Sequence, residues 1–308
     1  MKRLVSLLVS ATILALIYFQ IDWGAFARVL QAASGTRLAL SLGMVVPITG
    51  ITAWRLQLLV PNRAQLQWHK ACQLTLAASS LNMVLPSKMG DIAKAYFIQR
   101  RGILSGSLSL SLMVFEKVCD LLSLLFWGGV GGLLLAQPGW GLQWAGAAMG
   151  TIVAAVTWGI LSQSVSRSFF QLARQATPLD WHSKLGHLNN GWSEMQKYLH
   201  DNPKQSTIIA MASIGLWWLH IVQIWLFVWA LDSWVPLTEH IALVPLAILA
   251  GLLPLTFAGI GTRDAALAVL YEPYFALPTA VALGMLCTSR YVLPALGGLP
   301  YLSRYLRS

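Results

Sequence analysis

Several separate runs of apolar residues, each long enough to cross a lipid bilayer, constrain the fold of this chain more than any other feature. Residues 38–60, 142–161 and 208–231 are examples, and about 20 apolar residues in a helix span the hydrocarbon core. Only 10% of the 308 residues are charged and 56% are hydrophobic, whereas soluble domains carry about 25% charged residues. The sequence therefore predicts an all-α polytopic integral membrane protein, with a single domain over residues 1–308.

The formal net charge of +10 does not indicate nucleic-acid binding. Most basic residues lie in short loops between apolar runs, which is typical of cytoplasmic loops near anionic lipid, and no nucleic-acid motif is present. Cys72, Cys119 and Cys287 are far apart and form no CxxC pattern, so neither a metal site nor a structural disulfide is expected. We expect no cofactor.

Two apolar runs are interrupted by similar stretches, LPSKMGD at 85–91 and LPLTFAGIGTRD at 253–264. Their helix-breaking residues are Pro86, Gly90, Pro254, Gly259 and Gly261. Each stretch also carries a basic and an acidic residue, Lys88 with Asp91 and Arg263 with Asp264. Broken helices with charges at membrane depth are tolerated only where they line a cavity or are buried in protein. Two such stretches, one in each half of the chain, indicate a transporter-like site.

The distribution of basic residues predicts which side of the membrane each loop occupies. The N-terminus, residues 162–206 and the C-terminal tail carry lysine and arginine, so we expect them in the cytoplasm of a bacterial cell. The turns at 137–141 and 232–239 contain neither residue and are expected outside. No convincing signal-peptide cleavage site precedes Asp22, so the first apolar run is expected to remain as a span of the inner membrane.

This arrangement requires two segments to enter the membrane and return on the same side. The loops around Arg63 and Arg100 flank the first broken stretch, and both are expected inside. The second broken stretch lies within residues 241–274, which follow the outer turn at 232–239 and precede a last span that must start outside to end in the cytoplasmic tail. We therefore predict about six full spans plus two re-entrant hairpins of opposite orientation, as an inverted repeat produces. Arg28 and Arg37 in the expected outer link weaken this argument, and a plain eight-span arrangement is the alternative.

Residues 162–206 form the one long polar stretch. Apolar side chains recur there at helical spacing, at Leu185, Leu188, Trp192, Met195 and Leu199. We predict a cytoplasmic amphipathic helix on the membrane surface, in contact with anionic lipid.

Four local patterns resemble the transmembrane, flippase-like region of lysylphosphatidylglycerol synthases and the stand-alone membrane proteins related to it. They are WRLQLL around Arg55, PSKMGDIAK at 86–94, EKVCD at 116–120 and LPLTFAGIGTRDAA at 253–266. The resemblance covers nearly the whole chain. Lysine stands at 88, 94 and 117 where arginine is commoner, Asp264 replaces glutamate and Ala258 replaces glycine. Lysine keeps the positive charge but, unlike arginine, cannot bind a phosphate through two parallel hydrogen bonds from one planar group.

The resemblance implies lipid translocation, with polyprenyl or glycerophospholipid carriers as the substrate class. We expect a stand-alone member without the soluble synthase domain, and so a flippase or transporter for an anionic phospho- or polyprenyl-phosphate-type lipid. The alternatives are a membrane-embedded lipid-phosphate transferase and a structural partner of a lipid-modifying enzyme. No serine-hydrolase or HExxH metal motif occurs. The expected partner is the lipid itself, with a lipid-modifying enzyme or a second copy of the chain as open alternatives.

Charges at membrane depth cost about 2.5–3.5 kcal/mol each on insertion scales, so we expect them to be paired or to form a binding site. The predicted head-group contacts are Lys88, Arg263, Arg55 and Lys94. The predicted charge-pairing or proton-coupling residues are Asp91, Glu116, Lys117, Asp120, Asp264 and Arg290. Glu116 and Asp120 lie one helical turn apart, so they either share a proton or are neutralised by Lys117 and another base. A purely architectural role for the whole network is the alternative to lipid binding.

Overall fold

The computed structural model describes residues 12, 19, 21–61, 66–84, 90–135, 142–178, 181–252 and 261–307, and all structural statements below concern these residues. They form α-helices and no β-strand, which confirms the all-α prediction for this part of the chain. The helices are α2 (Trp23–Ala32), α3 (Gly35–Gly43), α4 (Val45–Leu59), α5 (Trp68–Val84), α6 (Gly90–Arg100), α7 (Gly106–Leu134), α8 (Leu142–Leu161), α9 (Gln163–Gln175), α10 (His182–Asp201), α11 (Pro203–Ala230), α12 (Leu237–Leu252), α13 (Thr262–Leu270) and α14 (Leu277–Arg307).

Three of the described helices are long and apolar enough to cross a membrane. They are Gly35–Leu59, which joins α3 and α4, Pro203–Ala230 and Leu277–Ser303, and the bent pair α8–α9 adds a fourth if it is counted as one span. The 28 residues of α11 extend about 42 Å at 1.5 Å per residue, more than the roughly 30 Å of the hydrocarbon core. A polytopic helical membrane protein with three to four apolar spans is thus established, while the six spans and two hairpins remain predictions.

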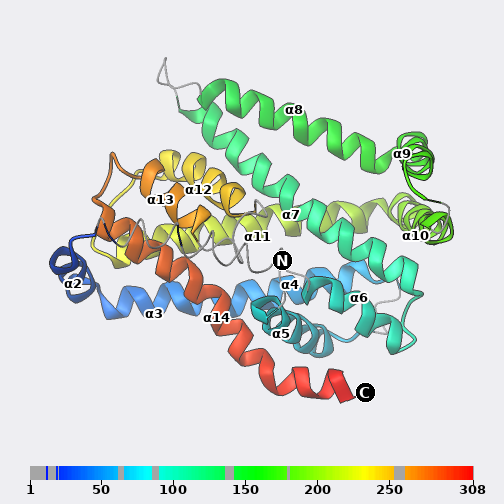
Figure 1. The fold of residues 1–308 in the computed structure, drawn as a ribbon, viewed down its shortest axis with the longest axis horizontal. Coiled ribbons are helices and arrows are strands. Elements are labelled where there is room, and N and C mark those ends of the chain that lie inside the picture. The colour runs from blue at the N-terminus through cyan, green and yellow to red at the C-terminus, as the bar shows by residue number, and fades with distance from the viewer. Residues whose placement is uncertain are drawn as a thin grey trace.

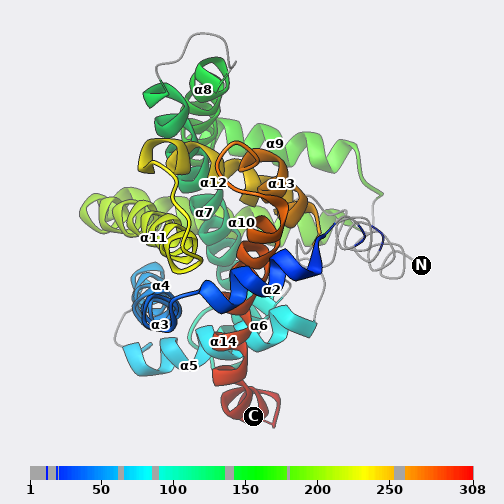
Figure 2. The same cartoon turned by 90° about the vertical axis from the view of Figure 1, so that its left-hand side faces the viewer.

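The long helices follow two directions. In Figure 1, α3, α4 and α11 run along the long axis of the molecule, whereas α7, α8 and α14 slope across it. The short helix α2 lies across one end, as Figure 2 shows, and α9 and α10 lie at the other end. Two pairs of shorter helices lie nearer opposite ends: α12 with α13 nearer the end that holds α2, and α5 with α6 nearer the end that holds α9 and α10.

The polar segment at 162–206 forms two helices rather than one. At Ser162 the chain bends by 84° between α8 and α9, and the Ser162 hydroxyl accepts a hydrogen bond from the Val165 amide at 3.4 Å, which caps α9. In α10 the predicted apolar stripe is turned toward the protein, because Met195 and Leu199 are buried in a core cluster. The stripe therefore packs the protein together, and membrane-surface binding by this segment stays a prediction.

Two apolar clusters hold the helices together. One contains Leu56, Leu112 and Met195 from α4, α7 and α10, and the other contains residues such as Phe227 from α11 and Leu283 from α14. Helix α7 contributes to both clusters. In a bilayer the lipid tails are as apolar as these side chains, so close van der Waals packing stabilises the contacts. Helix α7 is the element on which both halves of the described structure pack.

The two arginines that weaken the charge-based topology each contact an acid. Arg28 lies 4.0 Å from Asp22, and the Arg37 guanidinium lies 3.3 Å from Asp232. Arg37 also stacks over the Trp229 ring at 4.5 Å. These basic residues are thus paired with acids at the end of the molecule that carries α2, and the outer position of this end stays a prediction.

Helices α5 and α14 approach each other closely. The Ser80 hydroxyl of α5 donates a hydrogen bond to the Ala295 carbonyl of α14 at 2.6 Å. A Cβ atom built on Gly298 would overlap the Leu76 carbonyl oxygen, whereas one on the neighbouring Gly297 would meet nothing nearer than 3.9 Å. The absence of a side chain at Gly298 is therefore a condition for this contact.

We expect Gly298→Ala to destabilise the protein by about 1–3 kcal/mol, the usual cost of overpacking, because α14 must move away from α5. Gly297→Ala is the matched control and should leave stability unchanged or raise it slightly through better helix propensity. The thermal midpoint of unfolding in detergent micelles, followed by tryptophan fluorescence, measures both. Equal midpoints for the two variants would contradict the close approach.

Candidate functional site

A polar cavity of about 210 Å³ lies among the apolar helices. Its walls come from α4, α5, α6, α7, α11, α13 and α14. Arg263, from the second broken stretch, and Asp91 and Lys94, from the helix that follows the first, line the same cavity. The two stretches that the sequence singled out therefore border a common space, although they lie more than 150 residues apart in the chain.

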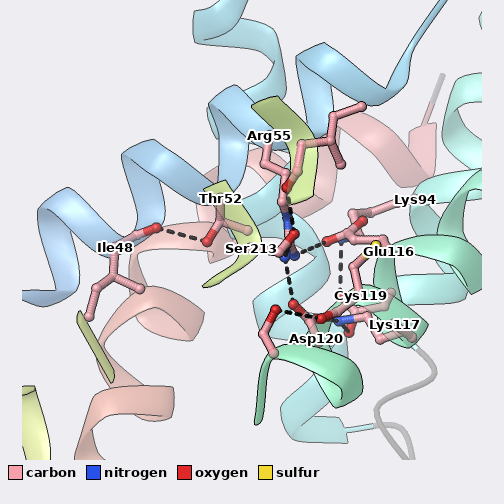
Figure 3. Close-up of polar contacts among 12 residues, drawn as sticks. Ile48, Thr52, Arg55, Lys94, Glu116, Lys117, Cys119, Asp120 and Ser213 are labelled. Atoms are coloured by element: carbon pink, nitrogen blue, oxygen red, sulfur yellow. Dashed lines mark hydrogen bonds and ion pairs between the residues drawn. The ribbon is translucent and has the colours of Figure 1, made fainter. Parts of the chain in front are cut away.

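Six charged side chains on α4, α6 and α7 form a closed ring in which positive and negative groups alternate (Figure 3). Listed around the ring, the nitrogen–oxygen distances are Arg55 to Glu116 3.2 Å, Glu116 to Lys94 2.9 Å, Lys94 to Asp91 3.3 Å, Asp91 to Lys117 2.9 Å, Lys117 to Asp120 3.0 Å and Asp120 to Arg55 2.6 Å. Every member contacts two partners of opposite sign, so the ring has no net charge.

Helical spacing supplies most of this geometry. Glu116 and Asp120 lie four residues apart and so share one face of α7, and Lys117 lies three residues before Asp120. Asp91 and Lys94 are likewise three residues apart on α6. Arg55 then closes the ring from α4, with one terminal nitrogen on Asp120 and the other on Glu116.

The ring is buried on one side and more open on the other. Only 2% of the Arg55 side chain and 1% of the Glu116 side chain is exposed, whereas 44% of the Lys117 side chain is exposed. The Ser213 hydroxyl of α11 accepts a further hydrogen bond from Arg55 at 3.1 Å and donates to the Ile209 carbonyl. Buried ions of this kind are stable only when they are paired and hydrogen-bonded.

A separate ion pair lies at the start of α13. Arg263 donates to the Asp264 carboxylate at 2.7 Å and to the Thr288 hydroxyl of α14 at 2.7 Å. Asp264 also accepts the Gly261 amide at 3.0 Å. Gly261 has φ 104°, a conformation that side chains disfavour, so glycine permits the abrupt start of α13 that brings Arg263 to the cavity.

Arg290 is the charged residue of the cavity wall that differs from the others. It is 4% exposed, and its guanidinium donates to two uncharged acceptors, the His220 ring nitrogen at 3.4 Å and the Tyr291 hydroxyl at 2.7 Å. Its guanidinium also lies 4.8 Å from the centre of the Tyr291 ring. No carboxylate among the described residues lies within ion-pair distance of it.

The structure brings together most of the residues that the sequence singled out. Arg55, Lys94, Asp91, Glu116, Lys117, Asp120, Arg263 and Arg290 line the cavity, and Asp264 is bonded to Arg263. Gly90 begins α6 and packs so closely on α5 that a Cβ would overlap the Ala78 carbonyl. Lys88, Pro86, Pro254 and Gly259 lie outside the described residues, and the roles expected for them stay predictions.

Two groups of cavity residues were missed from the sequence. His220 and Gln223 of α11 line the wall, as do Thr288 and Tyr291 of α14. His220 and Gln223 are polar residues three apart in a tryptophan-rich apolar span, and polar residues inside a span face a bundle interior or cavity. That signal could have identified them, whereas Tyr291 gives no such signal in an aromatic-rich chain.

We expect Arg55→Gln to destabilise the protein by about 3–5 kcal/mol, the usual cost of removing one partner from a buried ion pair, because Glu116 and Asp120 each lose a cation. Thermal unfolding in detergent micelles measures the effect. The control is Arg28→Gln, which breaks an exposed pair whose arginine is 77% exposed, and which should leave the midpoint unchanged. If Arg55→Gln unfolds at the wild-type temperature, the ring does not support the fold.

Comparison with known proteins identifies the family of this chain. The family model described as "Lysylphosphatidylglycerol synthase TM region" matches residues 3–297, nearly the whole chain. No curated protein and no solved structure gives a significant match. A membrane context related to lipids follows from the matched family and from the apolar helices. The chain is therefore a membrane protein that belongs to the lysylphosphatidylglycerol synthase transmembrane-region family.

Proposed function

We propose that the protein moves an anionic lipid across the bacterial inner membrane, holding the phosphate-bearing head group in the polar cavity while the acyl chains stay in the bilayer. The observation that carries this proposal is a buried cavity with charged walls inside a bundle of apolar helices. Ionisable groups at membrane depth are expensive and typically mark a transport pathway. The family membership supports a lipid as the cargo.

The size of the cavity supports a head group as its occupant. Its volume of about 210 Å³ is below the roughly 300–1,000 Å³ of sites that enclose a whole drug-sized ligand. A cavity of this size suits the phosphate-bearing head group of a lipid and not its acyl chains. The lipid tails must then lie elsewhere, and the surrounding bilayer is the natural place for them.

We further propose that α5 with α6 and α12 with α13 are two re-entrant hairpins that enter from opposite faces. Supporting this, the two pairs lie nearer opposite ends of the molecule (Figure 1). Lys94 from one pair and Arg263 from the other contact the same cavity. Motion of either hairpin would open the cavity toward one face, which is how alternating access operates in transporters with inverted repeats. Both chain termini and α9 are placed on the cytoplasmic side in this proposal.

Transport of a fluorescent anionic phospholipid in reconstituted vesicles tests the function. We expect wild-type protein to speed the movement of labelled lipid from the inner to the outer leaflet. This movement is measured as the loss of fluorescence to a quencher added outside the vesicles. The combined variant Lys88→Gln, Arg263→Gln and Asp264→Asn should slow this at least tenfold, because it removes the proposed tip contacts without leaving the Asp264 carboxylate unpaired.

A matched control replaces Arg167 and Lys184, two cations outside the cavity lining, by glutamine. It should transport at the wild-type rate. Size-exclusion chromatography checks that each variant is folded. Folded wild-type protein that moves lipid no faster than protein-free vesicles would refute the proposed transport.

We propose that Glu116 and Asp120 act by charge pairing and not by proton exchange. Glu116 contacts Arg55 and Lys94, and Asp120 contacts Arg55 and Lys117. Two cations beside each carboxylate favour its ionised form. A proton on either carboxylate would remove the attraction that holds two ring partners in place, so repeated protonation would disrupt the cavity wall.

Accordingly, an imposed pH gradient across the vesicle membrane should leave the wild-type transport rate unchanged. Glu116→Gln should slow transport equally with and without the gradient, because it breaks the ring in both cases. The measurement is the quenching rate at matched internal pH. A gradient-dependent rate that disappears in Glu116→Gln would show that Glu116 exchanges protons.

A further inference from the structure

We propose that Arg290 is the phosphate contact of the cavity and that it selects a head group with a net charge of −1, a phosphodiester, over zwitterionic and cationic head groups. This inference deepens the proposed lipid transport and rests on it.

The described charges of the site leave one positive charge without a partner. Five basic residues, Arg55, Lys94, Lys117, Arg263 and Arg290, face four acidic ones, Asp91, Glu116, Asp120 and Asp264. The first three cations belong to the neutral ring and Arg263 pairs with Asp264. Among the described residues the excess charge is therefore that of Arg290. Segment 85–89 adds the cation Lys88, and neither it nor segment 253–260 contains an acidic residue.

The neutral partners of Arg290 orient it without neutralising it. Because arginine can only donate, the His220 ring nitrogen accepts its hydrogen bond, which requires an uncharged imidazole. Tyr291 accepts a second hydrogen bond at 2.7 Å and presents its ring face to the guanidinium. These contacts stabilise the cation without cancelling its charge. An anion in the cavity would therefore be attracted to Arg290, and strongly so because the dielectric constant there is low.

Several buried polar atoms in the described part of the cavity wall also lack a hydrogen-bond partner. Among the described residues, eight buried side-chain nitrogen or oxygen atoms have no hydrogen-bond partner, and five of them belong to residues of the cavity wall. They are Nε of Arg55 and Arg290, Oγ1 of Thr75, Oδ1 of Asn82 and Oε1 of Gln223. Buried polar groups in native proteins are nearly always satisfied, so this concentration indicates a polar occupant, and the two guanidinium donors suit an anionic one.

A phosphodiester matches this environment in charge and size. Its single negative charge offsets the excess positive charge of the described residues. A zwitterionic or aminoacylated head group brings a further cation into a cavity that already has an excess one, and like charges in a closed site oppose binding. Arginine holds phosphate oxygens by paired, charge-assisted hydrogen bonds, which the small cavity leaves room for.

Binding to detergent-purified full-length protein tests the proposal, with phosphatidylglycerol, phosphatidylcholine and inorganic phosphate as probes and native mass spectrometry as the readout. We expect the wild type to retain phosphatidylglycerol at least tenfold over phosphatidylcholine. Arg290→Gln should lose at least tenfold in phosphatidylglycerol retention and leave phosphatidylcholine unchanged, and Arg290→Lys should keep most of the preference. Arg37→Gln is the control, because Arg37 also combines a ring contact with polar partners but lies outside the cavity.

Stability separates a binding role from a structural one. Removal of an uncompensated buried cation should leave the unfolding midpoint of lipid-free Arg290→Gln at or above that of the wild type, opposite in sign to Arg55→Gln. An unchanged lipid preference in Arg290→Gln, with or without a lower midpoint, overturns the proposal. Inorganic phosphate that competes as strongly as phosphatidylglycerol overturns the assignment to a lipid head group.

Transport in vesicles distinguishes failure of this inference from failure of the proposed function. If wild-type protein moves labelled phosphatidylcholine as fast as labelled phosphatidylglycerol, lipid transport stands and selection by Arg290 fails. If neither lipid moves while phosphatidylglycerol binding still depends on Arg290, the anion site stands and transport fails.

Discussion

Charge that is removed from water is stable only beside charge of opposite sign, and this requirement organises the centre of the protein. Arg55, Glu116 and Lys94 are almost fully buried, and each of them reaches two partners through the alternating ring. The ring connects α4, α6 and α7, which are separate in sequence, so it determines how these helices approach one another. The apolar clusters then pack around a polar centre whose geometry the ion pairs specify.

Arg290 differs from the cations of this neutral ring because no described carboxylate balances its charge. An ion pair gains little from a visiting anion, because its cation is already occupied, whereas a cation among neutral partners retains its full attraction. The same cavity thus contains one group of charges suited to holding helices together and one charge suited to recognition. Arg263 lies between these cases, since its charge is neutralised by Asp264 while its side chain still borders the cavity.

Local spacing predicted much of this architecture, and tertiary contacts account for the rest. The apolar runs predicted α8 and α11 closely, and the i, i+4 spacing placed Glu116 and Asp120 on one face of α7. The partners of these carboxylates depend on where α4 and α6 pack: Arg55 is 61 residues from Glu116 and Lys94 is 22 residues from it. Arg290 was predicted from the sequence to be a charge-pairing or proton-coupling residue. The lack of a described carboxylate near it is a property of the folded chain and could not be read from local spacing.

The closed ring also affects how this site can evolve. Reversal of one ring charge would create two repulsive contacts at once, and reversal of two neighbouring charges would still leave two, so the six positions are expected to change only as a unit. Arg290 stands outside the ring, and a substitution there alters the net charge of the cavity without breaking an ion pair among the described residues. Mutation can therefore alter the kind of lipid that is accepted independently of the framework that supports the fold.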